Sequence, residues 1–188
     1  MFDAGLWRKQ ANIVEEILGR APSFDKEMRL GPEEFELRHR RLIDALRKNG
    51  YDCGFVYSDE QYSGDVPYLG GNTNISVEPV AGIIGKNGFF LLAGLEGGYC
   101  AEQLAPRSGC KVRKVEMLKL ADEDYPVAAC RVEDVLEEAC GCRPSNIALL
   151  TPREVLPASI YTYLVDYFGD ASKVIDGQEI YYKLKYIK

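Results

Sequence analysis

The chain has 188 residues, a length that suits one ordinary domain with some excess. Hydrophobic residues make up 46% and charged residues 28%, which is typical of a globular protein with a core and excludes a disordered chain. The net charge of -6, with basic residues spread among acidic ones, argues against nucleic acid as a partner. No apolar run is long enough to span a membrane, and charges recur from Met1 to Leu18 where a signal peptide would lie. We therefore expect a soluble cytoplasmic protein that binds no membrane.

Apolar residues between Leu6 and Leu18 recur at near-helical spacing, which predicts a short amphipathic helix. The stretch from Arg20 to Gly31 contains Pro22 and has no periodicity, so we expect a linker there. The sequence thus divides into an N-terminal helical arm and linker over residues 1–31 and a main domain over residues 32–188. Two roles stay open for the arm: packing back onto the domain, or an oligomer contact.

Residues 32–48 carry the signals of a helix. Pro32 suits the first turn, acidic residues follow it, and basic residues precede the terminating Gly50. We expect its arginines in solvent. The apolar run over 53–57 then predicts a buried strand. The apolar face of the helix would consist of Phe35, Leu42, Ile43 and Leu46.

Residues 58–74 are rich in Ser, Asp, Gly, Pro and Asn, and they predict a long irregular loop. Loops of this kind often carry function. The runs over 77–84 and 89–93 predict two strands, and Asn87-Gly88 between them favours a hairpin. We therefore expect these strands to be antiparallel neighbours.

The second half alternates helices and strands. We expect helices over 94–105 and 131–140, the second ended by Gly141, and strands over 111–115 and 146–150. Thr151 and Pro152 suit the N-cap and first turn of a helix that runs to residue 168, with Pro157 near its start.

A strand over 172–175 and a helix over 177–188 close the sequence, with Ile180, Leu184 and Ile187 on one face of the helix. This last helix has no terminator, so we expect the chain to continue. Strands alternating with helices, plus one hairpin, predict an α/β fold of three layers, α/β/α, with a mixed sheet.

No local pattern forms a catalytic centre. His39, the only histidine, lies in the arginine-rich helix and is interpreted as a helix residue rather than a base. The acidic run over 122–124 lacks further ligand-like spacing. Gly94, Gly97 and Gly98 come without the lysine and hydroxyl of a phosphate loop. We therefore assign no catalytic and no metal-binding residue to this chain.

The six cysteines lie in apolar runs of a chain without an export signal, so we expect buried, reduced thiols. Cys140 and Cys142 are separated by one glycine, with Cys130 upstream. This spacing does not match the paired ligands of a zinc site.

The most distinctive stretch runs from Tyr62 to Asn72 and holds a second tyrosine, Tyr68. Its aromatic, amide and glycine residues could contact a ligand or a neighbouring subunit, or could fold back on the core. The sequence leaves both readings open. Tyr62, Tyr68 and Asn72 are the candidate substrate- or partner-contact residues.

Three features in order carry a family resemblance. Tyr68-Leu69-Gly70-Gly71 resembles a Tyr-Leu-Thr-Gly segment with glycine in place of threonine, and the end from Leu184 to Lys188 resembles Leu-Arg-x-Ile-Lys-Ser with lysine in place of arginine. Over residues 33–188 the chain resembles the N-terminal domain of the creatinase, prolidase and Xaa-Pro aminopeptidase (aminopeptidase P) family. Residues 6–31 have no counterpart. An R-x-x-L-x-x-x-L-x-x-x-G-x-D helix of that family is approximated by Arg41, Leu42, Leu46, Gly50 and Asp52.

This resemblance implies a ribonuclease-H-like three-layer domain that precedes a pita-bread catalytic domain. In such peptidases the catalytic domain holds two divalent metal ions (Mn, Co or Zn) with two Asp, one His and two Glu, which would polarise a carbonyl and generate a hydroxide. None of those ligands maps onto this chain, and creatinase itself works without metal. The expected partners are the protein's own C-terminal catalytic domain and a second subunit in a homodimer, whose active site the loop from Tyr62 to Asn74 would help to wall. The parent substrate could be an X-Pro peptide, creatine or another compound.

Two other functions compete with this one. A stand-alone binding or oligomerisation module would use the aromatic loop and the N-terminal arm. A thiol-dependent enzyme would pair a cysteine with His39.

Overall fold

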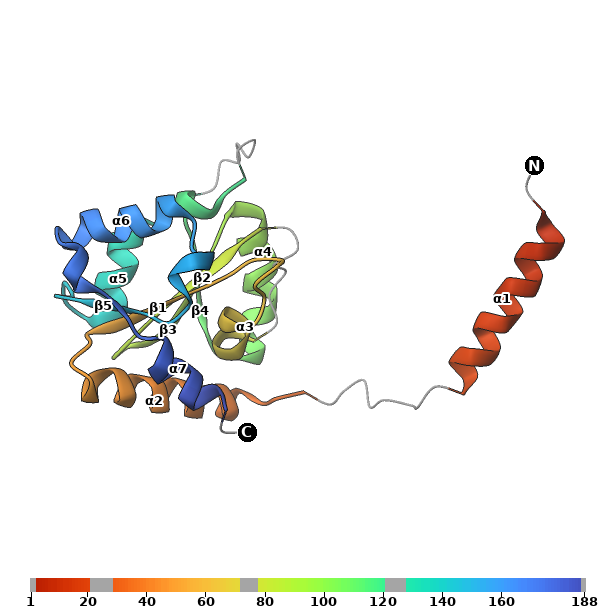
Figure 1. Ribbon diagram of the computed structural model, residues 1–188, viewed down its shortest axis with the longest axis horizontal. Coiled ribbons are helices and arrows are strands. Elements are labelled where there is room, and N and C mark those ends of the chain that lie inside the picture. Colours follow the sequence, from red (N-terminus) through yellow and green to blue (C-terminus); the bar gives the residue numbers. More distant parts are fainter. Residues whose placement is uncertain (1–2, 21–28, 72–77, 121–127, 187–188) are drawn as a thin grey trace.

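The computed structural model describes residues 3–20, 29–71, 78–120 and 128–186 (Figure 1). Its described strands form one six-stranded sheet in the order β4-β3-β2-β1-β5-β6. Strand β2 runs antiparallel to both of its neighbours, and the other pairs are parallel. The expected mixed sheet is therefore confirmed. The strands are β1 Cys53–Ser58, β2 Val80–Gly85, β3 Gly88–Ala93, β4 Lys111–Lys114, β5 Ile147–Leu149 and β6 Val174–Asp176.

Helices cover both faces of the sheet, as Figure 1 shows. Because alternate residues of a strand point to opposite faces, Phe55 of β1 packs in the core under α5 and α6, whereas Val56 packs in the core under the other helices. The three-layer α/β/α architecture is confirmed. One layer holds α5 Val132–Cys140 and α6 Ala158–Phe168; the other holds α2 Pro32–Lys48, α3 Asp65–Gly70, α4 Leu95–Leu104 and α7 Gln178–Lys185.

The hairpin of β2 and β3 forms as Asn87-Gly88 predicts, with Gly88 at a φ of 105° that favours glycine. The other expected helices and strands appear close to their predicted positions, and Gly141 ends α5 in the left-handed conformation. Short 3₁₀ turns connect several of them: Ala105–Arg107, Glu116–Leu118, Arg153–Val155 and Ala171–Lys173.

Two sequence predictions are wrong in their local structure. The stretch predicted as an irregular loop contains the short helix α3, which forms because Val66 and Leu69 are buried and Pro67 lies in its first turn. Thr151 does not cap a helix, since α6 begins at Ala158, after a 3₁₀ turn. The Thr151 hydroxyl is instead held inside the domain, as described below.

Two buried faces also differ from expectation. Arg38 of α2 is not in solvent, since its side chain is 15% exposed and packs on Tyr68. In α7 the fully buried residue is Tyr181, whereas Ile180 and Leu184 are only partly buried. Ile187, predicted on the same face, lies outside the described residues.

The N-terminal arm is helix α1, Ala4–Gly19, which confirms the predicted helix. The carboxylate of Asp3 caps it by accepting hydrogen bonds from the amides of Gly5 and Leu6. None of its residues is buried. Most of the predicted linker lies outside the described residues. No described helix combines the length and the apolar composition that crossing a membrane requires.

Candidate functional site

The segment between β1 and β2 lies against α7, at the other end of the domain sequence. The hydroxyl of Tyr62 hydrogen-bonds the hydroxyl of Tyr182, and the hydroxyl of Tyr68 donates to the carbonyl of Leu184 over 3.2 Å. Both tyrosines are half-buried, so each anchors to α7 and keeps part of its ring at the surface. Asn72, the third candidate contact residue, lies outside the described residues.

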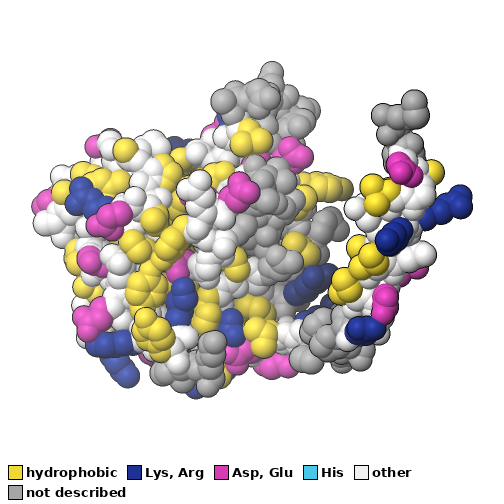
Figure 2. Space-filling view, turned by 45° about the vertical axis from the view of Figure 1, so that its right-hand side comes forward, with side chains coloured by type: hydrophobic (Ala, Val, Ile, Leu, Met, Phe, Trp, Pro, Cys, Tyr) yellow, Lys and Arg dark blue, Asp and Glu magenta, His cyan; other side chains and the backbone are white. Residues whose placement is uncertain are grey.

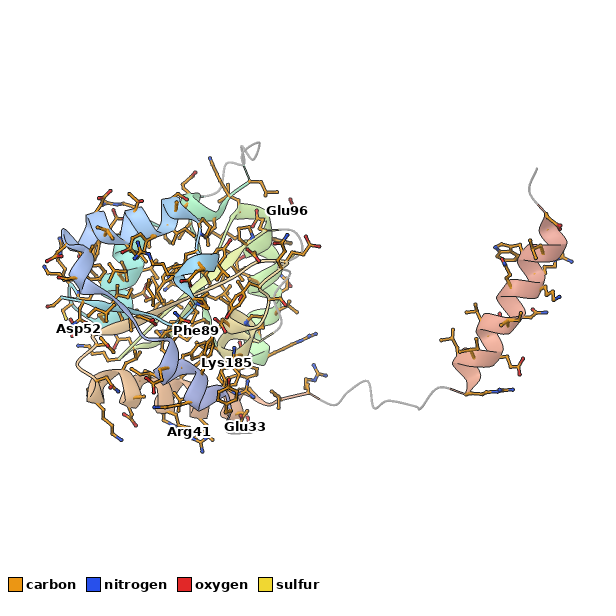
Figure 3. All side chains as sticks on the ribbon, viewed as in Figure 1. Glu33, Arg41, Asp52, Phe89, Glu96 and Lys185 are labelled. Carbon is orange, nitrogen blue, oxygen red and sulfur yellow. The ribbon has the colours of Figure 1, made fainter. Side chains whose placement is uncertain are left out.

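A buried carboxylate lies between these two tyrosines in the sequence. Asp65, at the start of α3, accepts a hydrogen bond from the Thr151 hydroxyl at 2.8 Å and pairs with the Lys185 ammonium at 2.5 Å. The Tyr181 hydroxyl donates to the Asp65 carbonyl at 2.6 Å. Figure 3 locates Lys185 on α7. The Asp65 network therefore ties α3, the end of β5 and α7 into one unit.

The same network reaches the backbone of β1. The Thr151 hydroxyl oxygen accepts from the Tyr57 amide at 2.9 Å, and the Ser58 hydroxyl accepts from the Val66 amide at 3.0 Å. These polar groups lie beyond the carboxyl ends of the parallel strands β1 and β5, where α/β proteins commonly place ligand sites. Here they bond to one another, which gives them a structural role.

The Tyr62 and Tyr181 hydroxyls stay protonated at neutral pH. Burial raises the pKa of Tyr181 well above its ordinary value. Burial, followed by the hydrogen bond with Tyr182, also raises the pKa of Tyr62. Neither phenol is therefore suited to act as a base.

A hollow of about 380 Å³ opens beside the end of α3 and is lined there by Gly71. Its apolar floor includes Phe35 and Pro67, and three arginines line it. The Arg38 guanidinium is held by Glu34 at 2.9 Å and by the Tyr68 carbonyl at 2.9 Å, and it stacks 4.3 Å from the centre of the Tyr68 ring. We call this feature the arginine hollow; its lining is Arg29, Leu30, Phe35, Arg38, Pro67, Gly71 and Arg107.

His39 lies on α2 and faces the sheet. Its Nε2 is 2.8 Å from the Leu69 carbonyl, and its ring centre is 5.4 Å from that of Phe89. Burial lowers the pKa of His39, so the ring is neutral at pH 7 and donates from Nε2. These contacts fit the helix-residue interpretation and leave Nε2 no role as a base for a thiol.

The cysteines follow the prediction only in part. Cys53, Cys110 and Cys140 are buried and all six are free, but Cys130 and Cys142 are exposed. The hydrogen bond with Cys140, together with burial, raises the pKa of Cys53 well above its ordinary value. Such a thiol is inert rather than nucleophilic. Cys130 directly precedes the helix predicted over 131–140 and Cys142 follows its end, so neither thiol lies on a face that the helix buries.

Within the described ranges, no three His, Cys, Asp or Glu side chains gather as metal ligands. The acidic run over 122–124 lies outside those ranges. The glycines near α4 have a packing role. A Cβ on Gly97 would lie 2.4 Å from Oε2 of the buried Glu78, which accepts the Gly97 amide at 2.7 Å. A carboxylate thus already occupies the start of α4, so this turn is not a phosphate loop.

Sequence reasoning missed the Asp65 network. From neighbouring residues alone, Asp65 would be interpreted as an acidic loop residue, Thr151 as a helix cap and Lys185 as an exposed lysine. The signal that was available is weak: an acid two residues before Pro67 at a helix start, and a lysine in the closing motif of the family.

No protein-family model and no curated protein matches the chain. Solved structures do match. The dipeptidase PepE from Mycobacterium ulcerans is 16% identical over 86% of this chain and 39% of its own, with a TM-score of 0.57. The X-Pro aminopeptidase from Thermotoga maritima is 21% identical over 80% of this chain and 36% of its own, with a TM-score of 0.55.

A third match is aminopeptidase P from Streptococcus thermophilus, 14% identical with a TM-score of 0.51. It covers 80% of this chain and 98% of the solved chain. The present chain therefore spans less than two-fifths of the first two proteins and nearly all of the third. Identities this low establish the fold. The chain has the three-layer α/β/α fold of the N-terminal domain in prolidases, Xaa-Pro dipeptidases and aminopeptidases P.

Proposed function

We propose that this chain is the accessory, non-catalytic domain of an Xaa-Pro peptidase or creatinase-like hydrolase. The observation that carries the proposal is a fold match that covers less than two-fifths of the length of a dipeptidase and of an X-Pro aminopeptidase. In such a protein the groups that break bonds would lie in a C-terminal catalytic domain, which is the proposed partner of this one. The chemistry described above supports this division, because His39 and the buried tyrosines are committed to structural contacts.

The proposed contribution to the substrate pocket centres on the segment with Tyr62, Tyr68 and Asn72. Tyr62 and Tyr68 hold this segment to α7. Because α7 would lead into the following domain, these contacts would fix the position of the segment relative to that domain. The arginine hollow includes Gly71, the residue that precedes Asn72 in the sequence, and presents positive charge above an apolar floor. A basic rim of this kind suits a carboxylate of a peptide or of a partner subunit. We therefore place one wall of the parent's pocket here.

The metal ions belong to the proposed catalytic domain. Two divalent ions (Mn, Co or Zn) would polarise the substrate carbonyl and activate water there. The described residues of this chain do not supply a set that fits such a centre. A homodimer is the proposed assembly, in which this domain would pack against its partner subunit.

Two measurements test the accessory role. The purified 188-residue chain, assayed with X-Pro dipeptides and tripeptides in added Mn²⁺ or Co²⁺, should release no amino acid. Hydrolysis by this chain would contradict the proposal. The coding sequence after Lys188 should continue in frame and supply two Asp, one His and two Glu, and a continuation without that set would remove the metallopeptidase assignment.

The pocket role is tested in the full-length protein. Asn72→Ala should raise KM or lower kcat/KM for an X-Pro peptide, and Arg107→Ala should do the same if the arginine hollow binds a substrate carboxylate. Arg40→Ala, on the solvent side of α2, is the matched control and should leave both constants unchanged. Equal kinetics for all three variants would dismiss the pocket wall.

A stand-alone oligomerisation module is the second candidate. One observation favours it: the apolar side chains of α1 are exposed (Figure 2), and no part of the chain that the structure describes covers them.

A further inference from the structure

Two cysteines from distant parts of the sequence meet where the last turn of α5 lies on the sheet. Cys53 begins β1 and Cys140 ends α5, and their thiols share a hydrogen bond. The Cys53 sulfur lies 3.7 Å from the Asn146 carbonyl oxygen. The Cys140 sulfur lies 3.9 Å from the carbonyl oxygen of Asp52, so it is next to the peptide bond that leads into Cys53.

A glycine in the neighbouring strand permits this close approach. The antiparallel register of β1 and β2 continues so as to set Cys53 opposite Gly85. A Cβ on Gly85 would lie 2.5 Å from the Ala139 carbonyl oxygen and 3.2 Å from the Cys140 nitrogen. The missing side chain therefore lets the backbone of α5 come close enough for the two thiols to touch. Disulfides require this kind of short backbone separation, generally below about 7 Å between Cα atoms.

The pair can be reached by small molecules from one side. A hollow of about 200 Å³ lies between the end of α2 and the end of α5, and Cys140 and Cys142 both line it. Cys140 is 5% exposed, whereas Cys53 is fully buried. A small oxidant in the hollow would therefore meet Cys140 before Cys53.

Two cations line the same hollow. They are Arg47 and Lys86, with Asp52 as an acidic neighbour (Figure 3). The Lys86 ammonium lies over Gly141, since a Cβ on that glycine would be 2.8 Å from Nζ. A positive charge is thus held beside the residue that follows Cys140.

The two thiols differ in how readily they ionise. The hydrogen bond with Cys53 lowers the pKa of Cys140 and Lys86 adds to this, whereas burial and Asp52 oppose it. The same hydrogen bond raises the pKa of Cys53. Because the thiolate is the reactive form of cysteine, Cys140 is the nucleophile of the pair.

Cys142 is the other thiol near Cys140, but it faces elsewhere. Its sulfur lies 3.9 Å from the Cys140 carbonyl oxygen, while the Cys140 sulfur is directed to the Asp52 carbonyl and to Cys53. The contact between sulfurs therefore favours Cys53 as the partner of Cys140.

We propose that hydroperoxides oxidise Cys140 and Cys53 to a disulfide, and that Cys140 is the thiol attacked first. The Cys140 thiolate displaces one peroxide oxygen as the O–O bond breaks, which gives a sulfenic acid and, after uptake of a proton, water or an alcohol. The Cys53 sulfur then attacks the Cys140 sulfur, the S–O bond breaks, and the hydroxide leaves as water with the Cys53 proton. The two thiols lose two electrons in all, and the peroxide gains them. This modification needs no peptidase parent.

The test starts from the fully reduced 188-residue chain. Hydrogen peroxide is added, remaining thiols are blocked with N-ethylmaleimide, and tryptic peptides are analysed by mass spectrometry. The expected first linked product joins Cys53 to Cys140, is two hydrogens lighter than the reduced peptides, and is separated by dithiothreitol. The bond closes a long loop, so the oxidised chain should also unfold at a higher urea concentration than the reduced one.

Variants assign the bond and the order of the steps. Cys140 and Cys142 fall in one tryptic peptide, so Cys142→Ser should keep the link to Cys53 and Cys140→Ser should lose it. Cys130→Ser removes an exposed thiol and is the matched control, which should form the link as the wild type does. In Cys53→Ser the sulfenic acid has no partner, so dimedone should label Cys140.

The role of the nearby cation is tested by rate. Lys86→Met should slow the formation of the link by about threefold, because it removes a positive charge that favours the thiolate. Lys183→Met, which removes a surface lysine from α7, should leave the rate unchanged.

Several results would overturn the proposal. One is a main product that joins Cys140 to Cys142, or that joins two chains through exposed cysteines. Another is a link between Cys53 and Cys140 that forms only after the chain is unfolded in urea. Labelling of Cys130 or Cys142 by dimedone in Cys53→Ser, without labelling of Cys140, would contradict the order of the steps.

Discussion

Asp65 and Lys185 form an ion pair across 120 positions of the sequence, with their charged atoms 2.5 Å apart. The Asp65 side chain is 1% exposed and the Lys185 side chain 24%. The pair fastens the last described helix to the segment that follows β1. In the proposed parent, α7 precedes the catalytic domain, so this contact would set the position of the wall relative to the pocket.

Lys185→Met should destabilise the domain by about 2–4 kcal/mol, because it leaves the buried Asp65 carboxylate with no cationic partner. Urea unfolding monitored by far-UV circular dichroism measures the change in the free energy of unfolding. Lys183→Met is the matched control, since Lys183 lies one half-turn away, is 72% exposed and pairs only with Glu179 at the surface. It should change stability by less than about 0.5 kcal/mol.

The double variant Asp65→Asn/Lys185→Met separates charge from packing. Removing both charges leaves no unpaired ion, so its cost should be smaller than the sum of the two single costs. Additive costs would show that the two groups do not interact in solution.

Tyr181→Phe should cost about 1–3 kcal/mol. The change removes the donor to the Asp65 carbonyl and leaves that carbonyl buried without this partner. Tyr186→Phe, five residues on and 83% exposed, is the control and should be silent in the same urea titration. An equally silent Tyr181→Phe would mean that the hydroxyl contributes nothing to holding α7.

The fold was largely predictable because its signals are local. Asn87-Gly88 sets the hairpin, Pro32 and Gly50 bracket α2, and Gly141 ends α5. Each signal acts within a few residues of its own position. The sequence does not predict helix α3, because the helix has only six residues and is stabilised by burial of Val66 and Leu69 rather than by local helix signals.

The candidate site was less predictable because it is built from distant residues. Tyr62 and Tyr68 were singled out, but their partners Tyr182 and Leu184 lie more than a hundred positions away. Thr151 has the local pattern of a cap, and only the folded chain places its hydroxyl on Asp65. No rule on neighbouring residues can find such a pair.

Stability should fall between about pH 7 and pH 5 because of His39. Burial lowers the pKa of His39 in the folded chain below the ordinary value of about 6.5, with smaller opposing effects from the Leu69 hydrogen bond and Glu36 and a smaller supporting one from Arg38. The unfolded chain therefore binds a proton at a higher pH than the folded one. The stabilisation is present above pH 6.5 and is lost as the pH falls toward the folded value.

His39→Gln tests this dependence, since glutamine keeps a donor for the Leu69 carbonyl and does not titrate. The free energy of unfolding of this variant should be nearly flat from pH 7.5 to pH 5.5, where the wild-type value declines. His39 is the only histidine in the chain, so no other side chain of that type can supply the slope. The same slope in both proteins would rule out His39 as its source.

Gly85→Ala should destabilise the domain by about 1–3 kcal/mol, although alanine is otherwise tolerated in a strand. A Cβ at Gly85 would lie 2.5 Å from the carbonyl oxygen of Ala139, at the end of α5, and backbone cannot move aside as a flexible side chain can. That oxygen also accepts the Asn87 amide at 3.0 Å, so displacing it would disturb the hairpin as well. Gly64→Ala is the control, because the nearest atom to its Cβ would be Nζ of Lys185 at 3.9 Å, an ordinary contact. Thermal unfolding should lower Tm for Gly85→Ala by several degrees and leave Gly64→Ala within about 2 °C of the wild type. A neutral Gly85→Ala would show that α5 does not pack this closely on β2.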